Sequence, residues 1–386
     1  MYPTLRILRG LACFAAIRVR YGLVLRGLCL IAVLEGLAGA GPDAPAENPD
    51  PNGAVTAPSG SGSASPWIDL APSAVLAKHS EATDSDLQAA SSMENHRTRA
   101  AIELGSFYAG FSVWAYFAWY RNHPPLSNYK FGGDGMFGVE TYAGGADKMG
   151  HAWATMALAR LGTSVLTEGG WDHTKSTLLS AGLSELLFLN VEIRDGFYFE
   201  FSYGDLAMDT VGMFAALALE LWPKLDEMFD YRVQYFPSPR YLDNLDGGSN
   251  RDGTPSCRKT ACSRWNIAED YSGQTYFIAF HPSSIHALRD SKYGLWSRFV
   301  DVGVGFQTRD YKPPPDPGDK LNAHQTLFVG VSLNVQGVID WLGRDGKHET
   351  LRKIGHGLFE VFNLPYTIGG VGVTRYAPDK PNSGGA

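Results

Sequence analysis

The spacing of hydrophobic and polar residues has two different patterns along the chain, and the pattern changes near Pro237. Before it, apolar residues gather in helix-length segments that are separated by loops containing Gly and Pro. The predicted helices span 97–120, 146–166, 174–193 and 202–230. After it, apolar and other residues alternate with a period of two, which is typical of half-buried strands. The pattern therefore predicts an α+β fold in which a four-helix bundle is followed by a β-rich unit.

The β-rich unit is predicted to be a small antiparallel sheet or a partial barrel that packs on the helices. Its predicted strands span 274–280, 299–306, 326–335 and 368–376. Four or five strands are too few to close an independent transmembrane barrel. Between the last two strands, one face of an amphipathic C-terminal helix is formed by Leu351, Ile354, Leu358, Val361 and Phe362.

The N-terminal 40 residues have the pattern of a secretory signal peptide: a basic flank, a short apolar run and small residues that end at Ala40. Glu35 interrupts the run, so an uncleaved N-terminal anchor is the alternative. The following Pro-, Gly-, Ser- and acid-rich composition predicts a disordered linker. The expected organisation is a leader at 1–40, a linker at 41–95, a helical bundle at 96–231 and a β-rich domain with one helix at 232–386.

Composition and charge narrow the functional classes. The chain has 386 residues, of which 44% are hydrophobic and 19% charged, so it can bury a sizeable core. Its net charge is −7, and the leader holds five Arg and one acid, which leaves 28 basic and 39 acidic side chains beyond residue 40. This acidic remainder excludes a globally basic nucleic-acid binder.

Two cysteines remain beyond the leader, Cys257 and Cys262, in a polar loop. Four intervening residues allow a tight loop that brings them within disulfide reach, and an oxidising compartment favours that bond. Half of a zinc site is the alternative, but no second Cys or His pair lies nearby at ligand spacing.

Several polar residues interrupt the most apolar helices. Asp147 and His151 are four residues apart, as are Asp205 and Asp209, so each pair shares one helix face. The candidate cluster comprises Asp147, Lys148, His151, Glu185, Glu192, Asp195, Ser202, Asp205 and Asp209. Helical bundles assemble metal sites from carboxylates and histidines on facing helices. A divalent metal held by Asp147, His151, Glu192, Asp205 and Asp209 is therefore one interpretation.

Two other interpretations of the cluster stay open. It is a structural seam if Ser202 and Asp205 form a helix cap and if Lys148 and Arg194 pair with neighbouring acids. It is catalytic if a carboxylate orients His151 for acid–base chemistry. The same acids help to decide whether the bundle lies in water or in a membrane, because a carboxylate in lipid is costly unless it faces a bundle interior. A polar seam suits a bundle in water and a bundle in a membrane, with water favoured.

Three ordered motifs carry a family resemblance. They are Asp147-Lys-Met-Gly-His151, Glu192-Ile-Arg-Asp195-Gly, and Ser202-Tyr-Gly-Asp205-Leu-Ala-Met-Asp209-Thr-Val-Gly212. Together they resemble the YfiM-like family of predicted periplasmic (lipo)proteins, a domain of unknown function, and more distantly VanZ-like membrane proteins. The leader departs from that family because it lacks the cysteine of a lipoprotein cleavage site.

The resemblance implies an exported protein in the periplasm or outer membrane of a Gram-negative-type envelope, associated with a membrane, with no reaction to carry over. We therefore expect a protein that is structural or that binds a ligand or metal through the cluster, with an envelope lipid, glycan or protein as its partner. The alternative is a metal-dependent hydrolase that acts on an envelope lipid or glycan.

Overall fold

The computed structural model describes residues 84–121, 123–132, 135–246, 267–292, 294–312, 322–346 and 349–378. The predicted leader, most of the predicted linker and the predicted disulfide between Cys257 and Cys262 lie outside the described residues.

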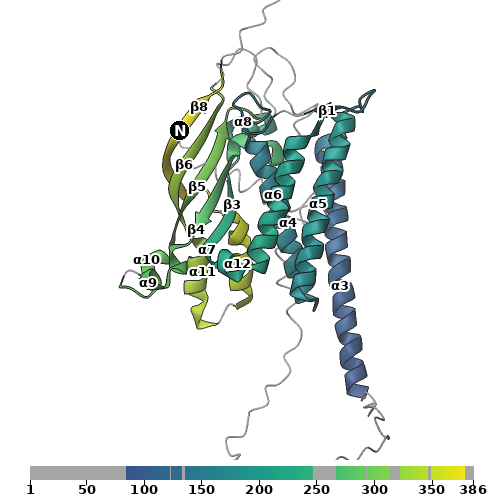
Figure 1. Cartoon of the computed structure of the whole chain (residues 1–386), viewed down its shortest axis with the longest axis vertical. Helices are drawn as coiled ribbons and strands as arrows, with labels where there is room; N and C mark the ends of the chain where they lie inside the picture. Colours follow the sequence, from purple (N-terminus) through teal and green to yellow (C-terminus); the bar gives the residue numbers. More distant parts are fainter. Residues whose placement is uncertain are drawn as a thin grey trace, which may run out of the picture.

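A layer of long helices stands beside one six-stranded sheet, which confirms the predicted mixture of helix and sheet (Figure 1). The long helices are α3 (Asp84–Ala115), α4 (Ala146–Glu168), α5 (His173–Tyr198) and α6 (Tyr203–Leu221). Helix α4 packs against both α5 and α6, which also contact each other, and α3 lies against α4. A short π-helical turn, η1 (Tyr116–Tyr120), ends the first of these helices.

The sheet has the strand order β7-β3-β4-β5-β6-β8. Its strands are β3 (Phe229–Tyr235), β4 (Gln274–Phe280), β5 (Val300–Arg309), β6 (His324–Leu333), β7 (Phe362–Asn363) and β8 (Ile368–Tyr376). All neighbours are antiparallel except β7, which runs parallel to β3. A separate parallel pair, β1 (Phe131–Gly132) and β2 (Phe201–Ser202), lies at one end of the helices.

Shorter helices connect the strands. They are α7 (Pro223–Met228), α8 (Pro239–Asp246), α9 (His286–Arg289), α10 (Gly294–Ser297), α11 (Val335–Leu342) and α12 (Glu349–Val361). Helix α12 packs against β3 and α11, at the lower end of the sheet in Figure 1. The expectation of one helix in this unit is therefore wrong.

The core sits where α4 meets the sheet. Ala143 and Ala146 pack with Val233 and Tyr276 in one buried cluster, and the Tyr231 hydroxyl donates to the carbonyl of Met149 at 2.8 Å. Small residues on α4 let neighbouring elements come close. A Cβ at Gly150 would lie 2.8 Å from the Tyr276 hydroxyl oxygen, so glycine is needed for this contact.

The helix boundaries differ from prediction in three places. Helix α3 begins at Asp84, so residues 84–95 are helical and not linker. Helix α5 continues through Gly196 to Tyr198, because this glycine leaves room for the ring of Tyr129. The fourth predicted helix ends at Leu221, since Pro223, which has no N–H, starts α7, and the chain then enters β3.

The predicted strands 274–280 and 368–376 coincide with β4 and β8, and the other two overlap β5 and β6. Strand β3 is missing from the prediction because Asp230 and Arg232 are buried in it, where the alternation of a half-buried strand predicts apolar residues. The parallel pairing of β7 makes the sheet mixed, so a wholly antiparallel sheet is also wrong.

Candidate functional site

Helices α4, α5 and α6 bring six of the nine predicted residues together. Asp147, Lys148 and His151 lie in the first two turns of α4, Glu192 on α5, and Asp205 and Asp209 at the start of α6. Asp147 and Asp205 each lie in the first turn of a helix, where the dipole favours a carboxylate. A Cβ on Gly212 would lie 3.0 Å from Cα of Ala152, so this glycine permits the close crossing of α4 and α6.

His151 is at the centre of the group. Its Nδ1 donates to Oδ1 of Asp209 at 3.0 Å, and Thr155 donates to the same oxygen at 2.9 Å. Its Nε2 lies 3.9 Å from one oxygen each of Asp147, Glu192 and Asp205. Asp209 therefore fixes the imidazole so that its free nitrogen faces three carboxylates from three helices.

Buried donors hold the three carboxylates in place. Nζ of Lys148, which is fully buried, lies 2.7 Å from Asp205 and 3.1 Å from Asp147. The hydroxyl of Tyr271, from the loop before β4, donates to Asp147. The backbone N–H of Ser202 donates to Oε2 of Glu192 at 3.0 Å. Oε1 of Glu192 is buried and has no hydrogen-bond partner among the described residues.

The charges of this group do not balance. Four carboxylates face one lysine and one histidine. Burial raises the pKa of Glu192 to about 9 and that of Asp205 to about 6. Burial also opposes ionisation of Asp147, but the positive charges of His151 and Lys148 outweigh it and lower its pKa. Burial lowers the pKa of His151, but Asp209 and Asp205 outweigh it and raise that pKa. The cluster therefore needs extra protons or a cation.

The remaining three predicted residues have separate roles. Ser202 caps α6, since its hydroxyl accepts from the backbone N–H of Asp205 at 3.2 Å. The hydroxyl of Tyr120 donates to Asp195 at 2.7 Å, and burial raises the pKa of Asp195 to about 7. Glu185 accepts from the hydroxyl of Thr210 at 2.7 Å, away from His151.

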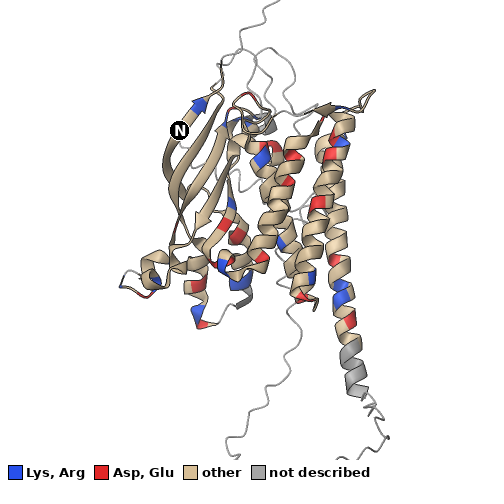
Figure 2. Ribbon diagram, in the orientation of Figure 1, with Lys and Arg blue, Asp and Glu red and all other residues tan. Residues whose placement is uncertain are grey.

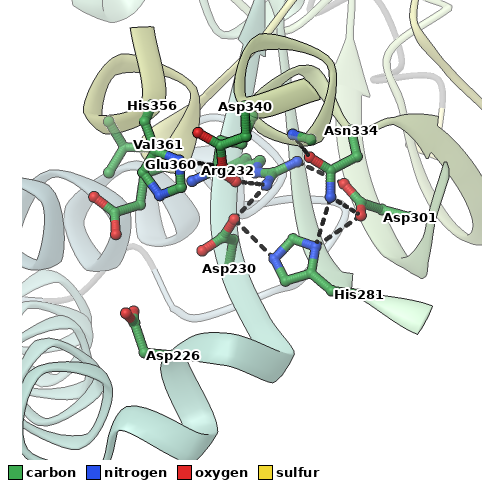
Figure 3. Close-up of polar contacts among 12 residues, drawn as sticks. Asp226, Asp230, Arg232, His281, Asp301, Asn334, Asp340, His356, Glu360 and Val361 are labelled. Carbon is green, nitrogen blue, oxygen red and sulfur yellow. Dashed lines mark hydrogen bonds and ion pairs between the residues drawn. The ribbon is translucent and has the colours of Figure 1, made fainter. Parts of the chain in front are cut away.

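A second buried network, which the sequence analysis missed, lies at one end of the sheet (Figure 3). Nδ1 of His281 donates to Asp301 at 2.7 Å and Nε2 donates to Asp230 at 3.0 Å. Arg232 donates to the same two carboxylates, at 2.6 Å to Asp301. Asn334, which caps α11, also donates to Asp301 at 2.9 Å.

The charges of this second network balance. Burial disfavours the charged imidazole, but the hydrogen bonds to Asp230 and Asp301 outweigh it and raise the pKa of His281 to about 9. Two carboxylates therefore face two cations. A buried hydrogen-bond network whose charges balance indicates a structural role. No local spacing signals it, because its members come from β3, β5 and the ends of β4 and β6.

A third group joins the long helices α4 and α6 to the short helices α7 and α12. Arg160 of α4 donates to Asp226 at 2.6 Å and to Glu360 of α12, and its Nε lies 3.1 Å from Glu220 of α6. Figure 3 shows Asp226 and Glu360 on the helical side of Asp230.

Among the described residues, three groups of His, Asp and Glu side chains place one possible metal-ligand atom each within 4.8 Å of the others. Two centre on His151, with Asp147 and Asp205 in one and Glu192 and Asp209 in the other. The third is Asp226, Asp230 and Glu360, and each of these three carboxylates accepts from an arginine. Lys148 pairs with two acids near His151 as well, but Oε1 of Glu192 has no hydrogen-bond partner among the described residues. The geometry therefore favours the group around His151, which we call the His151 cluster.

Within the described ranges, α5 alone is long and apolar enough to cross a bilayer. A helix in a protein core meets the same criteria. Helix α5 contacts both α4 and α6 and carries Glu192 into the His151 cluster, so we treat it as a core helix.

Comparison with known proteins gives one match. Residues 133–220 match the family described as "Predicted periplasmic lipoprotein (DUF2279)", whose function is unknown. No curated protein and no solved structure matches the chain. The matched stretch covers α4, α5 and α6 and therefore every residue of the His151 cluster. It supports export of this protein to the cell envelope.

Proposed function

We propose that this exported envelope protein binds a divalent metal ion in the His151 cluster, with His151, Asp147, Glu192 and Asp205 as ligands. The observation that carries the proposal is the convergence of His151 Nε2 with three carboxylate oxygens, each 3.9 Å away. One of these, Oε1 of Glu192, is buried and has no hydrogen-bond partner in the described part of the chain.

The donor set fits an ion of this class. One imidazole nitrogen with carboxylate oxygens suits zinc or manganese and similar ions. Asp209 supplies the second layer, because a metal-binding histidine usually donates its other N–H to a carboxylate, which fixes the ring and raises its basicity. A divalent ion also replaces the protons that Glu192 and His151 otherwise take up.

The ion has a structural consequence. Its ligands come from α4, α5 and α6, so binding draws the three helices together and adds to the free energy of unfolding. We therefore favour a structural or ligand-binding role for the site in the envelope. Association of the protein with an envelope lipid, glycan or protein is part of this proposal.

A metal-dependent hydrolase of an envelope lipid or glycan is the second candidate. His151 is the most exposed residue of its cluster, with 16% of its side chain accessible, so solvent reaches part of the imidazole. An ion held there would activate a water molecule, and Asp147 or Asp205, whichever did not bind the ion, would be placed to accept a proton.

Elemental analysis of the full chain, purified without chelators, tests the proposal. We expect one metal ion per chain, lost in Glu192→Gln and in His151→Ala. Glu185→Gln is the matched control, because Glu185 lies on the same helix outside the His151 cluster. Metal-free protein that does not bind added zinc or manganese, or equal metal in Glu192→Gln and Glu185→Gln, would contradict the site. Metal-dependent hydrolysis of a phosphodiester or ester probe that Glu192→Gln abolishes would favour the second candidate.

A further inference from the structure

The side of the sheet that packs on α4 through Val233, Tyr276 and Phe306 continues as an apolar surface that the described chain leaves uncovered. We call it the valine face: Ile278, Val302, Val304, Leu327, Val329, Val331, Leu333, Val371 and Val373, all of them exposed. The strand register aligns these side chains. Val304 pairs with Ile278 on one side and with Val329 on the other, and Val329 pairs with Val371. The exposed fraction rises along this row to 82% at Val371, on the edge strand β8.

The opposite side of the same strands has a different character. Its positions hold Gly303, Gly305 and Gly330 together with the buried rings of Phe277 and Phe328. Phe328 lies over Gly305, where a side chain would clash with its ring. Most of the large aliphatic residues of β5, β6 and β8 therefore lie on the valine face.

We propose that the valine face docks on a lipid bilayer. Its residues form a continuous surface without a charged or polar side chain, and Figure 2 shows little charge on β6 and β8 apart from a basic residue near the end of β8. A protein interface carries about one hydrogen bond per 100–200 Å². The valine face has no side chain to make one, whereas the hydrocarbon of a lipid requires none.

Both ends of the strands carry residues that suit a bilayer interface. At one end, Arg375 is exposed and lies on the same side of β8 as Val371 and Val373, whereas Tyr376 beside it faces the other side. At the other end, Trp296, 70% exposed, lies on α10 just before β5. Tryptophan favours the boundary between lipid and water, and arginine places its charge among headgroups. The valine face thus lies between an arginine and a tryptophan, both of which suit the boundary between lipid and water.

Photo-crosslinking tests which occupant covers the face. The full chain carries p-benzoylphenylalanine in place of Val371, and vesicles of phosphatidylethanolamine and phosphatidylglycerol are added before irradiation. Thr374 is the matched control position, because it is exposed on the same strand but points to the opposite side. We expect a phospholipid adduct from position 371 and none from position 374. A crosslinked dimer, or equal lipid adducts from both positions, would overturn the proposal.

Charge substitution gives an independent test that does not depend on the leader. The double variant Val329→Lys and Val371→Lys places two charges on the valine face, whereas Thr326→Lys and Thr374→Lys places them on the opposite face of the same paired strands. We expect the first to lower vesicle binding by about tenfold or more relative to the second, because charge on a lipid-facing strand is unfavourable. Circular dichroism confirms that both variants are folded. Equal binding would show that the valine face does not contact lipid.

Discussion

The crossing of α4 and α6 at Gly212 gives a sharp test of how the His151 cluster is positioned. In Gly212→Ala the new Cβ would lie 2.9 Å from the carbonyl carbon of Ala152 and nearer still to its oxygen. Relief of these contacts requires the two helices to separate by about 1 Å. Asp209, one turn earlier on α6, would then move beyond hydrogen-bond distance of His151, which is now 3.0 Å.

The expected loss of stability follows from these contacts. Overpacking costs about 1–3 kcal/mol, and a lost hydrogen bond to a charged group costs about 1.5–3 kcal/mol. Replacing a helical glycine by alanine returns about 1 kcal/mol. We therefore expect Gly212→Ala to lower the free energy of unfolding by about 1.5–5 kcal/mol.

Gly182→Ala on α5 is the matched control. Apart from its own helix backbone and its two neighbours, no atom of the described residues lies within 4 Å of the Cβ that this change adds. Only the helix-propensity gain remains, so the variant should be more stable by about 0.5–1 kcal/mol. Urea denaturation followed by far-ultraviolet circular dichroism measures both variants. If Gly212→Ala is as stable as Gly182→Ala, the close crossing does not position the cluster.

Three further predictions concern the rest of the fold. The pKa of His281 is about 9 in the folded chain against 6.5 for the free side chain, so its stabilisation is complete below about pH 6.5 and is lost as the pH rises through 9. Between about pH 6 and pH 9.5, wild-type protein should therefore lose up to about 3 kcal/mol more than His281→Gln in urea denaturation, and parallel pH profiles would contradict this assignment. Ser202→Ala removes the cap of α6 and should cost about 1 kcal/mol, whereas Ser202→Asp should retain most of the stability. Arg160→Met leaves three partly buried carboxylates without their counter-ion and should cost about 1.5–3 kcal/mol by the same measurement. A loss below about 0.5 kcal/mol would show that the ion pairs contribute little.

The sequence predicted features that depend on local spacing. The four-residue spacings of Asp147 with His151 and of Asp205 with Asp209 placed each pair on one helix face, and the polar start of α6 indicated its cap at Ser202. The alternation in β4 and β8 marked their limits because these strands combine regular apolar positions with clear ends.

Features that depend on distant partners escaped prediction. Asp230 and Arg232 read as polar surface positions until His281 and Asp301 are placed beside them. Lys148 pairs with the adjacent Asp147, as one interpretation expected, but its contact with Asp205 requires the crossing of α4 and α6. The crossing in turn depends on Gly212, whose importance is visible only when Ala152 lies against it.

The link from Arg160 to Glu360 has a consequence for the order in which the chain reaches its folded state. The two residues are 200 positions apart, and the indole N–H of Trp153 likewise donates to the carbonyl of Val361. Closing so long a loop is entropically costly and slow. Until α12 arrives, α4 lacks one of the carboxylates that compensate its buried arginine. A chain exported N-terminus first would therefore hold its helices incompletely packed until nearly all of its length had crossed the membrane, and this interval is when it is most exposed to aggregation and proteolysis.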